Sequence, residues 1–276
     1  MQAIFIGIRN HPWRSLIHLF AAFSVMWTLV DGFTHFIPSL NFRNIASLII
    51  VAVISIIYTA IILRQPSAVE IPIRHTNTKI EIKFGDLFNE DGLRVISVNE
   101  FFDSELGLPV DEKSLHGILI SRCFGGYSTT FDEIIERELK TIPAEIIDRT
   151  QGKTNKYPIG TSAVIAINND RYLCFALCKT EISTCKAYSD VPTLWQALDG
   201  LWHKARVVLG LNTLVIPLVG SGLAGIGLPA RELLYLIILS IITETKKKEL
   251  ATSIRIVLSP KYFDTIDLNE VKRYWR

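Results

Sequence analysis

The hydrophobic pattern divides the chain into two unequal parts. Two long apolar segments lie near its start, at about 15–33 and 45–63. The second has no charged residue, and the first has none before Asp31, although it includes His18. A helix needs roughly 20 apolar residues to cross the hydrocarbon core of a bilayer, so we expect a two-helix transmembrane hairpin over residues 1–64. Two buried core helices are the alternative, but a core helix usually has a polar face.

The distribution of basic residues predicts how the hairpin is oriented. Arg9 and Arg14 precede the first segment and several lysines and arginines follow the second, whereas the short connector holds only Arg43. Lysine and arginine are enriched on the cytoplasmic side of membrane proteins. We therefore expect a multi-pass protein with both termini in the cytoplasm.

Beyond the hairpin the pattern changes to short β-type runs that alternate with helical runs. Residues 65–78 lack periodicity and contain two prolines, so we expect a linker there and one α/β domain over 79–276. Most of the strands are apolar on both faces, as in a sheet covered by helices on both sides. We expect strands at 79–84, 93–98, 117–122, 162–168, 171–178, 212–219 and 253–259. We expect helices at 128–142, 191–210 and 229–248.

Charge and cysteine content limit the partners and metal sites that the chain can have. The net charge of the 276 residues is only +2, so we expect no nucleic-acid partner. The four cysteines (Cys123, Cys174, Cys178 and Cys185) form no C-x-x-C pair and have no matching histidines for a zinc site. We therefore expect free thiols, no metal, and a cytoplasmic location for the α/β domain.

A glycine-rich stretch, VIPLVGSGLAGIGLP, is the clearest candidate for binding. Gly220, Gly222 and Gly225 follow a strand in G-x-G-x-x-G spacing. The dinucleotide fingerprint requires an early position in the chain and a carboxylate after the next strand, and this loop has neither. A P-loop requires Lys-Ser/Thr after the glycines, and this pair is also missing. Small residues still let backbone amides approach an anion, so we expect a diphosphate here; a tight turn is the alternative. The residues expected to wrap the diphosphate are Gly220, Ser221, Gly222, Leu223, Ala224 and Gly225.

Two polar residues at strand ends extend this candidate site. Asp86 follows the first strand of the domain, where its carboxylate could accept a hydrogen bond from an amine such as that of adenine, or could be a turn aspartate. Asn99 ends a buried apolar strand and must find polar partners. Ligand recognition would supply them.

Taken in order, these motifs resemble the macro domain, the ADP-ribose-binding module. GDL at Asp86 and Leu87, VN at Val98 and Asn99, and GSGLAG at 220–225 match its aspartate motif, its V-N-x-x-N motif and its late glycine loop. The resemblance implies a macro-domain-like mixed sheet flanked by helices, with Asp86 on the adenine. A first phosphate loop is expected from Ser114, Leu115, His116 and Gly117.

The departures from the macro-domain pattern favour binding over catalysis. Phe102 replaces the second asparagine, which removes a group that could orient water, and Ala224 replaces an aromatic residue. We expect no catalytic residue and no cofactor, with Asn99, Asp103 and His116 near the distal ribose or its substituent. A membrane-anchored ADP-ribosyl hydrolase using those three groups, or a reader of ADP-ribosylated proteins, is the alternative.

Two membrane helices followed by such a domain resemble the membrane effector of Thoeris, a bacterial antiphage system. The resemblance implies location in the bacterial inner membrane and a TIR-domain partner that makes a nucleotide signal, expected to be histidine-ADP-ribose. It also implies membrane disruption and abortive infection. Because a hairpin of two spans cannot form a pore by itself, we expect a homo-oligomer in contact with lipid.

Overall fold

The computed structural model describes residues 2–37, 44–210, 213–222 and 225–275. The chain forms two compact units. One comprises Met1–Ser67 with Asp267–Asn269, and the other comprises Ala68–Ile266 with Glu270–Arg276. The α/β architecture lies in the second unit.

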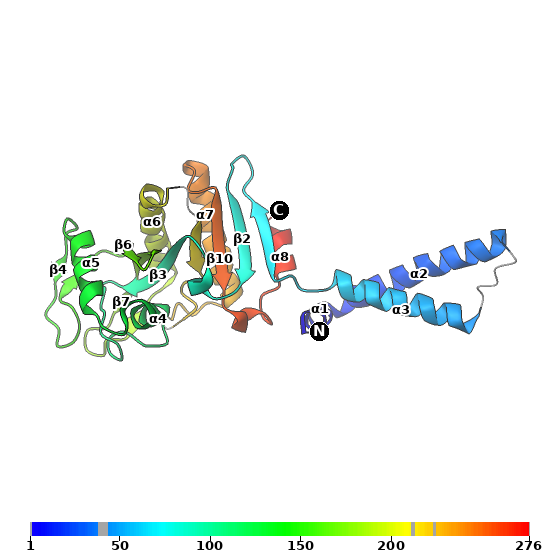
Figure 1. Ribbon diagram of the computed structural model, residues 1–276, viewed down its shortest axis with the longest axis horizontal. Helices are drawn as coiled ribbons and strands as arrows, with labels where there is room; N and C mark the ends of the chain where they lie inside the picture. The colour runs from blue at the N-terminus through cyan, green and yellow to red at the C-terminus, as the bar shows by residue number, and fades with distance from the viewer. Residues whose placement is uncertain (1, 38–43, 211–212, 223–224, 276) are drawn as a thin grey trace. The chain divides into compact units, whose positions relative to one another are not determined.

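The first unit is built on a helical hairpin. Helices α2 (Pro12–Phe36) and α3 (Ile45–Ile62) run side by side, and a short α1 (Gln2–Asn10) precedes them (Figure 1). Both long helices have the length and composition of membrane spans, and little or none of their apolar surface is buried inside the protein. The two apolar helices are therefore confirmed as a candidate transmembrane hairpin.

The second unit is a mixed sheet with the strand order β1-β2-β10-β9-β3-β7-β6, and β8 pairs with β7. The five strands from β2 to β7 in this order are parallel, and β1 and β6 are antiparallel to their neighbours at the two ends. The strand bounds are β1 Ala68–Pro72, β2 Lys79–Phe84, β3 Leu93–Asn99, β6 Ser162–Ile167, β7 Asp170–Thr180, β8 Ala187–Tyr188, β9 Leu214–Pro217 and β10 Ser253–Leu258. A separate small sheet pairs β4 (Glu145–Ile146) with β5 (Asn155–Lys156).

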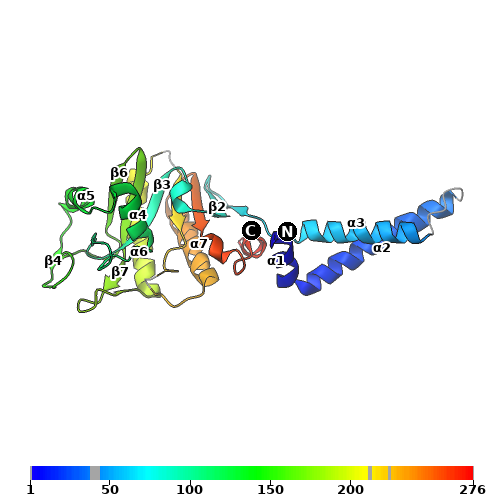
Figure 2. The same cartoon turned by 60° about the horizontal axis from the view of Figure 1, so that its bottom comes forward.

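Helices pack on the sheet because its central strands are apolar on both faces. Strand β7 is buried continuously from Tyr172 to Cys178. Side chains of α4 (Leu115–Phe124) and α5 (Thr129–Leu139) share one apolar core with Ile96 and Cys174, which are register partners on β3 and β7. Helices α6 (Val191–Val208) and α7 (Ala230–Lys247) lie next to each other (Figure 2), and the Trp202 indole N–H donates to Ser240 Oγ at 2.6 Å. The expected α/β class is thereby confirmed.

One predicted strand is a helix. Residues 117–122 belong to α4, because the Ser114 hydroxyl accepts a hydrogen bond from the Gly117 N–H at 2.9 Å and caps the helix start. Gly125 ends the helix in the left-handed conformation, with φ of 65°. A short apolar run does not distinguish a buried helix from a strand; the serine cap and the terminal glycine were the signals that do.

Part of the predicted linker is also a strand. Residues 68–72 form β1, which pairs antiparallel with β2 and alternates exposed and buried side chains. Pro72 is tolerated at its end, because β1 is an edge strand. The chain therefore enters the sheet earlier than its weak periodicity indicated.

Candidate ligand-binding site

A cavity of about 730 Å³ lies at the carboxyl ends of the parallel strands. It forms because β3 and β9 pair only at their beginnings, through Leu93–Leu214 and Arg94–Val215. From there the chain continues from β3 to α4 and from β9 to α7. Such a divergence at the carboxyl edge of a sheet is where open α/β folds bind ligands.

The structure brings most of the predicted site residues to this cavity. Those that line it are Asp86, Leu87, Asn99, Ser114, Leu115, His116, Gly220, Ser221 and Gly222. Asp103, Gly117 and Gly225 do not line it. Leu223 and Ala224 lie outside the described residues.

The glycine loop after β9 offers backbone amides to the cavity. Gly220 has a φ of 80°, and a Cβ there would collide with the Ile226 side chain, so the position requires glycine. The Ser221 hydroxyl donates to the Leu218 carbonyl at 2.6 Å, and the Tyr262 hydroxyl donates to the Ser221 carbonyl at 3.3 Å. Within the described part of the chain, the N–H groups of Ser221 and Gly222 have no hydrogen-bond acceptor. These two amides are free to donate to an anion.

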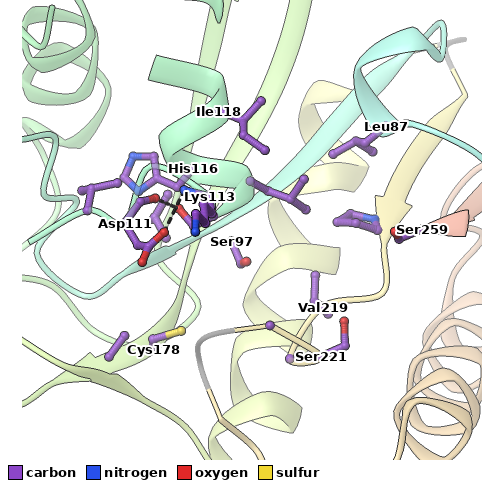
Figure 3. Close-up of a pocket in the computed structure, with 18 of the residues that line it drawn as sticks. Leu87, Ser97, Asp111, Lys113, His116, Ile118, Cys178, Val219, Ser221 and Ser259 are labelled. Atoms are coloured by element: carbon purple, nitrogen blue, oxygen red, sulfur yellow. Dashed lines mark hydrogen bonds between the residues drawn. The ribbon is translucent and has the colours of Figure 1, made fainter. Parts of the chain in front are cut away.

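The start of α4 presents a second set of amides. Ser114 is fixed by its hydroxyl, which donates to the Asp111 carbonyl at 2.7 Å, and the Lys113 N–H donates to Asp111 Oδ1 at 2.7 Å. The first-turn N–H groups of Leu115 and His116 therefore lie at the positive end of the helix dipole. Figure 3 shows Asp111, Lys113 and His116 on one side of the cavity, with Leu87 and Ser259 on the other.

Gly117 has a packing role instead of a contact with the cavity. A Cβ at this position would overlap the backbone of Asp111 and Glu112. The glycine lets the first turn of α4 sit directly on the preceding loop. The expected backbone contact from Gly117 is thus replaced by a capping bond to Ser114.

Asp86 combines a structural role with access to the cavity. Its Oδ1 accepts a hydrogen bond from the Phe88 N–H at 3.1 Å and caps a short 3₁₀ helix (Leu87–Asn89). Arg122 Nη1 donates to Asp86 Oδ2 at 3.2 Å, while the Arg122 guanidinium lies 5.0 Å from the centre of the Phe88 ring. The Asp86 side chain remains 40% exposed. Both interpretations of this aspartate, as a turn residue and as a cavity residue, therefore fit the geometry.

His116 is a neutral, buried imidazole at the cavity wall. It is 5% exposed, its ring lies 5.3 Å from that of Phe131, and its Nε2 has no hydrogen-bond partner among the described residues. Burial, with a smaller contribution from the charge of Lys153, lowers the pKa of His116 to about 3. A group with so low a pKa is a poor general base near neutral pH.

Asp103 lies away from the ligand cavity, in a buried polar network. Its carboxylate is fully buried, pairs with Arg149 Nη1 at 3.0 Å, and accepts hydrogen bonds from Asn99 Nδ2 at 2.8 Å and the Lys153 N–H at 2.7 Å. Asn99 Oδ1 in turn accepts from the Phe101 and Asp103 N–H groups. Asn99 therefore finds its polar partners in its own loop, and the expected placement of Asp103 beside the ligand is not observed.

Phe102, which replaces the second asparagine of the V-N-x-x-N motif, is part of the core. Its side chain is fully buried, and its ring packs edge-to-face on Tyr157 at 5.7 Å. Its φ of 52° is unusual for an aromatic residue. The surrounding core therefore holds this turn in place, and the phenyl ring does not line the cavity.

Comparisons with known proteins identify the family of the domain. The family described as "Thoeris protein ThsA, Macro domain" matches residues 80–259, which is more than half of the chain. The chain belongs to the Thoeris ThsA macro-domain family. No curated protein sequence matches it.

Solved macrodomains share the fold of this ThsA-type domain. The Oceanobacillus iheyensis macrodomain with MES bound is 13% identical, with a TM-score of 0.50 and coverage of 75% of this chain and 96% of that one. A glycine-to-valine mutant of that macrodomain with ADPR is 12% identical, with a TM-score of 0.50 and coverage of 75% and 98%. At this identity the likeness shows the fold alone.

Sequence reasoning missed the cations around the ThsA-type cavity. Among the described residues, its lining includes four cations, Lys113, Arg122, Lys186 and Lys261, and two carboxylates, those of Asp86 and Asp111. Lys261 could have been found, because it follows β10 and the carboxyl ends of parallel strands meet at one edge. Lys186 lies in the β7–β8 turn, which had no sequence signal. The excess of positive charge suits an anionic ligand.

Two cysteines line this cavity. Cys178 and Cys185 line it, but all four cysteines are free, and burial raises the pKa of Cys178 to about 12. Such a thiol stays protonated and is a weak nucleophile. The described residues include no cluster of three or more His, Cys, Asp or Glu side chains placed to hold a metal ion.

The lowered pKa of His116 predicts a specific loss of stability in acid. Because the pKa of the folded protein lies below the ordinary value of 6.5, protonation favours unfolding. The contribution of neutral His116 to the free energy of unfolding is fully present above about pH 6.5 and is lost as the pH falls toward 3. At pH 5 the free energy of unfolding is lower by about 2 kcal/mol than at neutral pH. We expect the thermal midpoint of the full chain in detergent to fall more between pH 7.5 and 5 than that of His116→Phe. An identical pH dependence in both proteins would contradict the assignment.

Removal of the buried Asp103 carboxylate should destabilise the domain strongly. Asp103→Ala leaves the Arg149 guanidinium buried without its partner, which costs about 3 kcal/mol or more. This corresponds to a decrease of roughly 6 °C or more in the thermal midpoint of a domain of this size. The matched control is Glu70→Gln, which breaks an exposed pair with Lys79 and should leave the midpoint nearly unchanged. Equal midpoints for the two variants would show that the network carries little stability.

Proposed function

We propose that this chain is the membrane effector of a Thoeris-type antiphage system, and that its macro domain binds an ADP-ribose derivative. The observation that carries the proposal is the pair of facing amide sets, in the glycine loop and at the start of α4, around a cavity with excess positive charge. Free amides and a helix N-terminus are the usual ligands of phosphate groups. Family membership supports the same assignment.

The cavity has the size and the arrangement for one extended nucleotide. Sites for ligands of this class occupy roughly 300–1,000 Å³, and the cavity has about 730 Å³. We place the adenine beside Asp86 and Leu87, and the diphosphate between residues 220–222 and the 114–116 amides. A macrodomain of the same fold was solved with ADPR, which supports this class of ligand.

The distal ribose would then lie toward Asn99 and the β7–β8 turn. Thr184, Cys185, Lys186 and Ala187 line this end of the cavity and could surround a substituent on the ribose. Histidine-ADP-ribose made by a TIR-domain partner is the signal that we propose. Mass spectrometry of the small molecule retained by the chain, when it is purified beside an active TIR protein, tests this identity; recovery of unmodified ADP-ribose alone would contradict it.

Binding without turnover is favoured over the alternative of an ADP-ribosyl hydrolase. Asp103 is held in its ion pair with Arg149, and His116 has a pKa near 3, so neither is suited to act as a general base. Release of free ADP-ribose from an ADP-ribosylated substrate would support the hydrolase instead. A passive reader of ADP-ribosylated proteins predicts no toxicity when the ligand is supplied to cells.

The hairpin would connect ligand binding to the membrane. We place α2 and α3 across the bacterial inner membrane, in contact with lipid and with both termini in the cytoplasm. A ligand shifts an assembly equilibrium only if it binds one state more tightly. The proposed signal must therefore bind the assembled homo-oligomer preferentially, and this assembly would disrupt the membrane and abort infection.

Substitution of Asp86 should weaken ADP-ribose binding through loss of the adenine contact. Asp86→Asn keeps an oxygen that can cap the Phe88 N–H but loses the carboxylate charge, whereas Asp86→Ala loses both. We expect titration calorimetry with ADP-ribose to show a roughly tenfold or greater loss of affinity for Asp86→Ala, as one charge-assisted hydrogen bond contributes about 1.5 kcal/mol or more. Asp86→Asn should retain the fold. Wild-type affinity in both variants would refute the assigned role.

Gly222 allows the diphosphate contact to be tested with little effect on the fold. A Cβ at Gly222 would meet nothing within 4 Å, in contrast to Gly220. Gly222→Glu should abolish ADP-ribose binding, because it places bulk and negative charge against the phosphates, while its thermal midpoint stays close to that of wild type. Gly222→Ala is the control and should bind more tightly than the glutamate variant. Equal affinity of the two variants would show that the diphosphate does not bind at this loop.

A further inference from the structure

The chain that follows β10 leads from the ligand cavity to the first unit within a few residues. Residues 259–262 line the cavity, whereas Asp267–Asn269 belongs to the same unit as α2 and α3. Four residues, 263–266, separate these two stretches. We call residues 259–269 the connecting segment.

At the cavity, the connecting segment contacts the peptide group between Ser221 and Gly222. The Tyr262 hydroxyl donates to the Ser221 carbonyl at 3.3 Å, which is longer than the usual distance of about 2.7–2.8 Å for a hydroxyl donor. The Gly222 N–H of the same peptide group has no acceptor within the described part of the chain. This contact can therefore shorten, and the amide on the other side of the peptide plane is available to a ligand.

An anion on the Gly222 amide would strengthen the Tyr262 contact. The C=O and N–H bonds of a planar trans peptide point in opposite directions, so a phosphate at the amide does not compete with the tyrosine at the carbonyl. Hydrogen bonds that share a peptide group polarise one another and become stronger together. A diphosphate bound at Gly222 should thus hold the Tyr262 hydroxyl more tightly than the empty site does.

Backbone hydrogen bonds inside the connecting segment link the position of Tyr262 to that of Asp267. The Tyr262 N–H donates to the Ser259 carbonyl at 2.9 Å. The Tyr262 carbonyl accepts from the N–H groups of Thr265 at 3.1 Å and Ile266 at 2.9 Å. Asp267 follows this turn directly, so the turn determines where its carboxylate lies.

At its other end, the connecting segment holds the junction between α1 and α2. Asp267 Oδ2 lies 2.5 Å from His11 Nε2, and both side chains are mostly buried. Asp267 Oδ1 accepts a hydrogen bond from the Asn269 N–H at 2.8 Å, which fixes the carboxylate. His11 is the residue between the two helices and immediately precedes Pro12, where α2 begins. The carboxylate of Asp267 is therefore placed to fix the start of α2.

We infer that the connecting segment communicates ligand binding to the membrane hairpin. A diphosphate at the 221–222 peptide group stabilises the contact of Tyr262, the turn positions Asp267, and Asp267 holds His11 at the start of α2. The inference rests on the proposed function, because it assumes that this peptide group binds the diphosphate. Coupling between two sites is reciprocal, so the Tyr262 hydroxyl affects both the ligand affinity and the response of α2.

Hydrogen exchange of the full chain in detergent, with and without saturating ADP-ribose, tests the inference at residues 8–16. In the wild type we expect ADP-ribose to slow exchange severalfold in peptides that cover 8–16 as well as 219–222. Tyr262→Phe removes only the hydroxyl, so saturating ADP-ribose should still protect 219–222 but no longer 8–16. Its affinity for ADP-ribose should fall by a few-fold at most, because a neutral hydrogen bond makes a modest net contribution. Tyr274→Phe, at a 68% exposed position outside the segment, is the matched control and should respond like the wild type.

His11→Ala interrupts the same connection at its membrane end. His11 does not line the cavity, so this variant should bind ADP-ribose with an affinity close to that of the wild type. It should nevertheless lose the ligand-dependent protection of 8–16. His203→Ala, which changes an exposed histidine on α6, is its control.

The outcomes separate this inference from the function on which it rests. Protection of 219–222 by ADP-ribose without a change at 8–16 in the wild type would overturn the inference and leave the proposed function intact. A wild-type response of 8–16 in Tyr262→Phe or in His11→Ala would also overturn it, because the contact removed would then not be required. If calorimetry shows no binding of ADP-ribose to the wild-type chain, the proposed function fails and the inference fails with it.

Discussion

The site depends on the separation of β3 from β9. The two strands share only their first register pairs, so that their carboxyl ends part and leave a cavity between the helix that follows β3 and the loop that follows β9. The loop after β9 contains the amides of Ser221 and Gly222, and the chain after β3 leads to the first turn of α4, so the same separation that opens the space also brings hydrogen-bond donors to its walls. Were the two strands paired along their full length, neither the cavity nor the facing amides would exist.

The surrounding polar network keeps this opening in shape. Asp103, Asn99 and Arg149 connect the turn after β3 to the segment around β4 and β5, and Arg149 Nη2 also lies 3.5 Å from Cys185 Sγ beside the cavity. A buried pair of this kind contributes less to net stability than its removal costs. The network fixes one conformation of the loop. Backbone N–H groups of the same loop hold the Asn99 side chain, and Asn99 forms part of the cavity wall.

Sequence patterns predicted the parts of the structure that local chemistry determines. The core strands, the apolar hairpin and the glycine loop follow from periodicity and from residues with few alternative roles. The strand predicted at 117–122 was wrong because a short, mainly apolar run fits a buried helix equally well, and the Ser114 cap decides between them. The ion pair of Asp103 could not be predicted, since Arg149 is 46 residues away in sequence. The cations at the cavity depend on tertiary arrangement in the same way.

The two units differ in chemistry: the α/β unit has a cavity with unbonded amides and an excess of positive charge, and the other has two long apolar helices. We propose that the amides of Ser221 and Gly222, with those of Leu115 and His116, donate to a diphosphate. Hydrogen exchange of the full chain with and without ADP-ribose measures these amides directly. We expect slower exchange in peptides that contain 219–222 and 115–116, with no change in the β1–β2 turn. Unchanged exchange at both segments, under conditions in which calorimetry shows ADP-ribose bound, would contradict it.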